Sequence, residues 1–464
     1  MRTKIRWLAM LMVFGLIVAA CGDDAATDTT AAPDDAAETT AAPDMAETTA
    51  APEETPETTA APGGEIATDF GVDLEAGVIR IGMLSDLTGP FGPLVSAILA
   101  GTEAYWAQVN ASDGVNGLQV ELVVRDTTYD VPNHIALYGE IKDQVVAIGH
   151  STGSPHTVAI NADLQADGMF AIPLTWYSGW SDSAINSNIL SHGVSYCVES
   201  MNTIGYLKET DNPDAVTIAI ASLPGDYGLD SANGALLAAE ALGLTVVDAG
   251  IGGINPADES TLTEVANAIV AAAPDIVWVA TTPSTFSAIY GQALAAGLET
   301  RWSGPSPSWN PAFVGPDSPI KDAIARDFIG GLPTTNWTAD AMAPWREAFT
   351  AAGAPPTDYY AEGIVEAAIV HQALLAAYDS GDMTRAGVLA AAKSLENVDF
   401  SGIAPSEAYV GADNDRLQRA GFIFQPDPAG LADGSSAGLI LLESEYTSQI
   451  AAAYEFTGAC YVLE

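Results

Sequence analysis

Two stretches of the sequence, Val145–Thr157 (VVAIGHSTGSPHT) and Asp275–Thr285 (DIVWVATTPST), contain residue types that hold polar or anionic groups. Each begins with an apolar run typical of a buried strand and continues into small and hydroxyl residues. A proline then marks the start of a helix, whose first backbone N–H groups have no partner within the helix. Such a junction binds anions or polar groups. Because the pattern occurs twice, the sequence predicts two similar α/β halves facing each other across a cleft.

The first stretch also contains a pattern of nucleophilic catalysis. Gly149–Gly153 (GHSTG) fits the GxSxG nucleophile elbow, with Ser151 as the nucleophile, and it follows a strand as that motif requires. A hydrolase then needs an acid and a histidine later in the chain. The later histidines, His156, His192 and His371, do not lie on loops after late strands. Binding without chemistry is therefore the favoured interpretation, and an exported serine hydrolase is an alternative.

The elements that position these stretches alternate between strands and helices. Strand-like apolar runs occupy residues 78–84, 118–125, 145–148, 170–174, 216–221, 245–247 and 276–280, with a short one near Trp302. Helical segments of ten or more residues separate most of them, which predicts βαβ units and parallel sheets. Ligands of such sheets bind beyond the carboxyl ends of the strands.

Length and charge narrow the class of protein. A chain of 464 residues predicts two or three domains, and 48% hydrophobic residues are enough for sizeable cores. The net charge of −45 comes from 60 acidic and 15 basic residues, without a cluster of Lys or Arg. This balance argues against nucleic acid as a partner and favours solubility outside the cell.

The first 68 residues are typical of a targeting segment followed by a tether. In residues 1–20, three basic residues precede an apolar stretch that is shorter than the roughly 20 residues of a membrane-spanning helix. The sequence VAACG at 18–22 resembles the lipobox of bacterial lipoproteins, which implies cleavage before Cys21 and lipid on its thiol. A plain secretory signal or a membrane anchor is the alternative. Residues 21–68 repeat TTAAP and predict a disordered, acidic, Ala/Thr/Pro-rich tether.

With Cys21 assigned to the lipid, Cys197 and Cys460 remain. An even number of cysteines in an exported protein favours a disulfide over two buried free thiols. The bond would tie the end of the chain to its middle.

Several segments together resemble one protein family. They are VIRIGMLSDLTGP, GVNGLQVELVVRDTTYDVP, VVAIGHSTGSPHT, the Gly225–Gly228 turn (GDYG) and ALAAGLETRWSGP. Their order and spacing resemble the extracytoplasmic solute-binding proteins of branched-chain amino acid (Leu/Ile/Val-type) ABC transporters, of the type I periplasmic binding protein family. The resemblance runs from about Gly77 to the end of the chain.

The resemblance implies an α/β fold of two doubly wound parallel-sheet lobes joined by a three-crossing hinge. Residues 77–192 plus 333–402 would form lobe 1, and residues 193–332 plus 403–464 would form lobe 2. We expect the crossings near residues 191–196, 330–334 and 400–404.

The family also implies where a ligand binds. Its loops after the third and fourth strands hold the ligand carboxylate through hydroxyls and backbone N–H groups, and aromatic residues cover the ligand. The candidate ligand-binding residues are Ser151, Thr152, Gly153, Ser154, Thr175, Trp176, Tyr177, Ser178, Tyr227, Thr282, Ser306 and Tyr360. The alternative for the hydroxyl residues is a simple N-cap, and for the aromatic residues it is core packing.

One position departs from the family. Amino-acid binders place a Glu after the Gly-Pro of the second lobe to pair with the ligand ammonium, whereas here Ser306 follows Gly304-Pro305. Burying an ammonium without a counter-charge is costly. Either Asp226 or Asp126 supplies the charge, or the ligand is not an α-amino acid. Thr282, where the family carries an aromatic residue, adds to this departure.

These observations predict a lipid-anchored solute-binding protein on the outer face of the cell membrane. It would be a monomer that closes on a small polar solute, such as an amino acid, an amide or a related small acid, and delivers it to the permease subunits of an ABC importer. We expect no cofactor, no metal and no catalytic residue. A ligand-sensing receptor component of the same fold is the second alternative.

Overall fold

The computed structural model describes residues 65–463. The predicted signal peptide, the lipidation site at Cys21 and nearly all of the tether lie outside the described residues. No helix within residues 65–463 has both the length and the apolar character needed to cross a bilayer.

The first sheet is parallel apart from one short edge strand. Its order is β4-β3-β5-β6, and β2 pairs antiparallel with the start of β3. The strands are β2 (Val72–Asp73), β3 (Val78–Ser85), β4 (Gln119–Asp126), β5 (Ala147–Thr152) and β6 (Ala171–Leu174). A separate two-stranded pair joins β1 (Ala67–Thr68) to β12 (Asp382–Met383).

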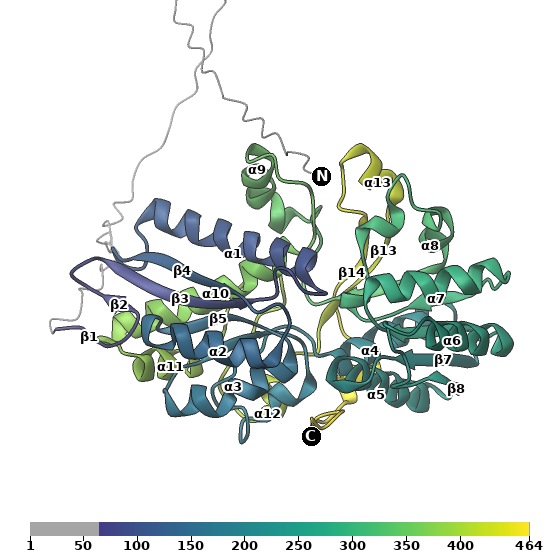
Figure 1. Ribbon diagram of the computed structural model, residues 1–464, viewed down its shortest axis with the longest axis horizontal. Helices are drawn as coiled ribbons and strands as arrows, with labels where there is room; N and C mark the ends of the chain where they lie inside the picture. Colours follow the sequence, from purple (N-terminus) through teal and green to yellow (C-terminus); the bar gives the residue numbers. More distant parts are fainter. Residues whose placement is uncertain (1–64, 464) are drawn as a thin grey trace, which may run out of the picture. The chain divides into compact units, whose positions relative to one another are not determined.

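Helices cover both faces of this sheet. One face packs on α1 (Gly92–Ser112), α10 (Tyr360–Ser380) and α11 (Arg385–Lys393), and the other on α2 (Val131–Ile141) and α3 (Ser154–Ala166). Figure 1 shows α1 and α2 on opposite sides of β3 and β4. Side chains alternate along a strand, so Ile81 and Met83 enter the core with α1 and α10, while Leu84 enters the core with α2 and α3.

The α1–α10 contact depends on glycine. A Cβ on Gly363 would lie 1.9 Å from the carbonyl oxygen of Ile98, and one on Gly101 would lie 2.2 Å from that of Tyr360. The two helices therefore touch through their backbones, which fixes the first turn of α10 against the middle of α1.

The second sheet is wholly parallel, in the order β10-β9-β7-β8. Its strands are β7 (Thr217–Ser222), β8 (Thr245–Gly250), β9 (Ile276–Ala280) and β10 (Arg301–Ser303). On one face lie α4 (Tyr196–Tyr206) and α5 (Gly225–Leu242), and on the other lie α6 (Glu259–Ala272), α7 (Pro283–Ala295) and α8 (Lys321–Asp327). Along β9, Trp278 faces α4 and α5, whereas Val277 and Val279 face α6 and α7.

A third, antiparallel sheet was not expected from the sequence. It consists of β11 (Gly330–Leu332), β13 (Gly421–Pro426) and β14 (Leu439–Tyr446). The remaining helices are α9 (Ala343–Ala351), α12 (Asp413–Arg416), α13 (Pro428–Asp433) and α14 (Gln449–Ala453).

The two parallel sheets, each covered on both faces, confirm the predicted α/β architecture. Several boundaries differ from the prediction. In particular, β5 was expected to end at residue 148, but it continues through Thr152. The hydroxyl run after residue 150 thus begins as strand, because its backbone still pairs with β6 up to Leu174.

The predicted disulfide is present between Cys197 on α4 and Cys460, with the two Cα atoms 6.3 Å apart. It holds a C-terminal tail, residues 459–463, against the loop after β6. The backbone N–H of Cys460 donates to Ser178 Oγ over 2.8 Å, and the Tyr177 hydroxyl donates to the carbonyl of Tyr461 over 2.7 Å.

Replacing both cysteines, Cys197→Ser with Cys460→Ser, should lower the free energy of unfolding by about 3–5 kcal/mol, because the bond closes a very long loop in the unfolded chain. Urea denaturation of the oxidised protein and the double variant measures the difference. Equal denaturation midpoints would show that the bond does not stabilise the fold.

Candidate functional site

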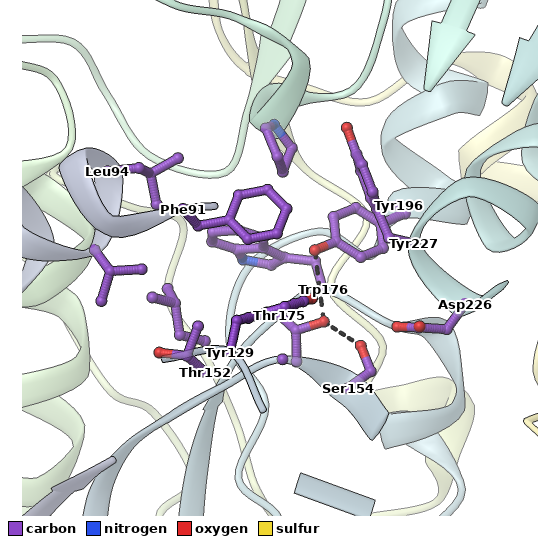
Figure 2. Close-up of a pocket in the computed structure, with 14 residues that line it drawn as sticks. Phe91, Leu94, Tyr129, Thr152, Ser154, Thr175, Trp176, Tyr196, Asp226 and Tyr227 are labelled. Carbon is purple, nitrogen blue, oxygen red and sulfur yellow. Dashed lines mark hydrogen bonds between the residues drawn. The ribbon is translucent and has the colours of Figure 1, made fainter. Parts of the chain in front are cut away.

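A cavity of about 40 Å³ lies where strands of both parallel sheets end. It is shown in Figure 2 and is lined by Phe91, Leu94, Val95, Tyr129, Thr152, Gly153, Ser154, Leu174, Thr175, Trp176, Tyr196, Asp226, Tyr227 and Pro307. This volume holds about one or two water molecules. A solute the size of an amino acid therefore requires the walls to move apart.

A groove of about 1080 Å³ adjoins the cavity. It shares Phe91, Leu94, Tyr129, Asp226 and Tyr227 with the cavity wall. Two further predicted site residues, Thr282 and Tyr360, line this groove and not the cavity. The shared residues thus lie between the inner cavity and the wider groove.

The polar end of the cavity is formed where β5 leads into α3. Gly153 precedes the helix with φ +95°, a conformation that favours glycine, and no side chain caps this N-terminus. The Ser154 and Thr175 hydroxyls are hydrogen-bonded to each other, and the Tyr196 hydroxyl reaches Thr175 Oγ1 over 3.5 Å. Figure 2 shows these hydroxyls converging. An uncapped helix N-terminus beside hydroxyl donors is suited to an anionic group.

Aromatic rings form most of the remaining wall. Phe91 and Tyr129 meet edge to face with centroids 5.0 Å apart, and Tyr196 and Tyr227 do so at 4.9 Å. The Tyr227 hydroxyl donates to the carbonyl of Thr281 over 2.9 Å, which fixes its ring. These surfaces are suited to an apolar ligand body.

One carboxylate lines the cavity. Asp226, at the start of α5, is only 7% exposed. Burial raises its pKa, and the Ser154 hydroxyl and nearby backbone N–H groups partly offset this effect.

Ser151 does not form a nucleophile elbow. It lies within β5, is fully buried and does not line the cavity. Its Oγ is 2.7 Å from Thr157 Oγ1 and 3.2 Å from His134 Nε2. The GxSxG residues form the end of β5 and the start of α3, and Ser151 faces the core. The hydrolase hypothesis for Ser151 therefore has no structural basis.

Three other predicted residues also lie outside the cavity wall. The Tyr177 hydroxyl bonds to the C-terminal tail, and Ser178 donates its backbone N–H to Asp230 on α5 over 3.1 Å. Ser306 is buried, and its N–H donates to the Glu199 carboxyl over 2.7 Å. Of the predicted set, Thr152, Gly153, Ser154, Thr175, Trp176 and Tyr227 line the cavity together.

Several lining residues were missed by sequence reasoning. They are Phe91, Leu94, Val95, Tyr129, Leu174, Tyr196 and Pro307. Phe91 and Tyr129 follow the first and second strands of their sheet, so the rule that ligands bind beyond strand ends could have found them. Tyr196 begins α4, a helix without a clear apolar period in the sequence.

A buried network of histidines and carboxylates lies behind the cavity. His150 Nδ1 is 2.8 Å from Glu366 Oε2 on α10, and both side chains are fully buried. The other oxygen of Glu366 lies 3.8 Å from Nε2 of His192, and Nδ1 of His192 lies 3.9 Å from Glu362. The Thr334 hydroxyl donates to Glu362 over 2.8 Å.

This network connects the cavity wall to the segments where the hinge crossings are predicted. His150 Nε2 lies 2.9 Å from Thr152 Oγ1 in the wall, and Gly193 donates its N–H to Glu407 over 2.8 Å. Burial raises the pKa values of Glu362 and Glu407 to about 7. Burial acts on Glu366 in the same direction, but the two histidines outweigh it and lower the pKa of Glu366.

Two α/β bodies whose strand ends share one small cavity define a two-lobed solute-binding protein. Residues 78–434 match the family model described as periplasmic binding protein. The chain belongs to this family and has its type I fold. Members of the family bind solutes outside the cytoplasm and are not enzymes.

Solved structures support this assignment. The chain is similar to a fatty acid ABC transporter substrate-binding protein from Thermomonospora curvata, at 27% identity and TM-score 0.74, over 84% of this chain and 97% of that one. A branched-chain amino acid ABC transporter protein from Thermus thermophilus with bound valine aligns at 18% identity and TM-score 0.67, over 81% and 97%. LivJ from Streptococcus pneumoniae in complex with isoleucine aligns at 16% and 0.61, over 79% and 99%. No match was found among curated proteins.

The raised pKa values predict a pH-dependent stability. Glu362 and Glu407 bind more protons in the folded state, so their contribution to stability is full below their unfolded pKa of 4.5 and is lost as the pH rises to about 7. Across this window each carboxyl should lower the free energy of unfolding by about 1.4 kcal/mol per pH unit. The variant Glu362→Gln should reduce the wild-type slope by this amount, and Glu407→Gln should do the same.

Urea denaturation at several pH values between 5 and 8 (roughly the window set by the shifted carboxyls) measures these slopes. Glu396→Gln, on an exposed residue, is the matched control and should keep the wild-type slope. A wild-type slope in both buried variants would mean that the two carboxyls stay ionised in the folded protein.

Proposed function

We propose that this protein is the extracytoplasmic substrate-binding lipoprotein of an ABC uptake transporter. It closes over a small solute with a carboxylate or amide end and an apolar body, such as an amino acid, an amide or a related small acid, and delivers it to the permease. The main support is the cavity itself, because its wall combines Ser154 of α3 with Tyr227 of α5, from helices that follow strands of different sheets.

The wall favours such a solute on chemical grounds. The uncapped N-terminus of α3 and the Ser154 and Thr175 hydroxyls would hold the carboxylate. Leu174, Trp176 and Tyr227 would cover the apolar body. Valine and isoleucine, which are bound in two of the similar structures, and the fatty acids of a third protein combine a carboxylate with an apolar body in the same way.

The proposed mechanism is a shift between open and closed lobes. A ligand that touches both lobes stabilises the closed form, which the permease recognises. The 40 Å³ cavity is too small for the solute without such a movement. The lobe boundaries given above, the lipid on Cys21, the acidic tether and a monomeric state belong to this proposal.

The ligand class can be tested by thermal shift of the purified protein against apolar amino acids, amides and carboxylic acids. A ligand at a hundred times its Kd adds about 2.7 kcal/mol to the free energy of unfolding. We expect at least one member of these classes to raise the Tm. If none of the three classes changes the Tm, the proposed ligand classes are wrong.

For a ligand found in this way, Ser154→Ala and Thr175→Val should each weaken binding by about tenfold to a hundredfold, because each removes a hydrogen bond to a charged group. Isothermal titration calorimetry measures the Kd. Thr263→Val, on the exposed face of α6, is the control and should bind as the wild type does. Unchanged affinity in both site variants would place the carboxylate elsewhere.

A further inference from the structure

The charges around the cavity are uneven. Its polar end offers hydrogen-bond donors for an anion, and no lysine, arginine or histidine lines it within the described residues. Asp226 is the only Asp or Glu among the lining residues. A site that binds a ligand carboxylate and also contains the Asp226 carboxylate brings two like charges together in a small, largely buried cavity.

The position of Asp226 makes this conflict direct. The residue lies in the first turn of α5, opposite α3, and Figure 2 shows its carboxylate pointing toward Ser154. The same hydroxyl belongs to the proposed carboxylate anchor. A ligand carboxylate bound there would have the Asp226 side chain beside it, and two carboxylates that share a site cannot both remain ionised cheaply.

The other acidic groups near the cavity do not line it, and each accepts hydrogen bonds elsewhere. The Asp126 carboxylate accepts from the Leu87 N–H and the Thr88 hydroxyl, over 3.0 and 2.7 Å. Asp86 accepts two backbone N–H groups of the loop after β3. Glu199 accepts the N–H of Ser306 and does not line the cavity.

No lysine or arginine in the part of the chain that the structure describes lines the cavity beside Asp226. His156 lies beside Gly153, and burial lowers its pKa, so the ring is neutral near pH 7. A cationic group on the ligand would therefore be the missing partner. It would pair with Asp226 while the ligand carboxylate stays on the hydroxyls, and both buried charges would then be compensated.

We propose, on the basis of the proposed function, that Asp226 is the specificity-determining residue of this site: it pairs with a cationic group of the ligand and so selects apolar zwitterions over simple apolar carboxylates. Asp226 would then pair with the ligand ammonium, the role that a glutamate has in the family's amino-acid binders at the position that Ser306 occupies here.

The test compares ligands that differ only in the ammonium group. Leucine, valine and phenylalanine are titrated by calorimetry beside isocaproate, isovalerate and hydrocinnamate, which keep the same carbon skeletons without the amine. The wild-type protein should bind its best amino acid at least about a hundredfold more tightly than the matched acid, as expected for a buried charge pair.

The variant Asp226→Asn should weaken amino-acid binding by about a hundredfold and tighten binding of the matched acid by about tenfold. Asp226→Glu keeps the charge and should keep the preference for the amino acid. Glu240→Gln removes a negative charge from an exposed position on the same helix and should change neither affinity. Circular dichroism confirms that each variant is folded.

Each outcome separates this inference from the function on which it rests. One outcome is that the wild type binds the simple acids as tightly as the amino acids, with a ratio that Asp226→Asn does not alter. In that case Asp226 is not the specificity residue, but the proposed function as a binding protein for small apolar acids is unaffected. The same conclusion follows if the variant fails to fold and the wild type shows no preference. If no compound of either series binds the wild type, the carboxylate anchor and the role of Asp226 are both wrong.

Discussion

Parallel strands place all their carboxyl ends at the same edge of a sheet, and the functional surface of this protein depends on that constraint. Phe91 and Tyr129 follow β3 and β4, Ser154 and Trp176 follow β5 and β6, and Tyr227 follows β7. These residues are far apart in sequence, yet they meet in one cavity because each occupies the same kind of position in its own βα unit. The strand ends fix where these residues lie, and the side chains of the loops and helix starts form the cavity wall.

Titratable side chains that are costly to bury lie behind the cavity. The side chains of His150 and Glu366 are fully buried. Burying such groups destabilises the fold unless each has a partner. Their pairing fixes the His150 ring, which in turn holds Thr152 at the cavity wall. The network continues through His192 and Glu362 to Thr334, so the wall and the predicted crossings share one set of polar contacts.

Much of this architecture could be predicted from sequence because apolar runs and helix starts are local signals. The alternation from Val78 to Trp302 gave the two parallel sheets, and the Ser154 and Thr175 loops were identified as strand ends. The direction of individual side chains could not be predicted in the same way. Ser151 and Thr152 are neighbours of similar type, but strand alternation turns Ser151 into the core and Thr152 into the cavity wall.

Other features depend on partners distant in sequence. In the antiparallel sheet, β13 pairs with β11, a strand far earlier in the chain, with Leu332 opposite Phe422. No short window of sequence reveals this pairing. The sequence showed that Ser306 stands where the family's amino-acid binders carry a glutamate. The structure shows that the Ser306 N–H donates to the Glu199 carboxyl of α4, a contact between segments 107 residues apart.

The C-terminal tail has a consequence for the order in which the protein matures. Cys197 lies 263 residues before its partner Cys460. Since a chain is made from its N-terminus, Cys197 has no partner for this bond until residue 460 has been synthesised. The tail then settles on Tyr177 and Ser178, next to Thr175 and Trp176 in the cavity wall. Formation of the bond therefore follows synthesis of residue 460, and removal of residues 459–463 would remove the contacts that support the loop after β6.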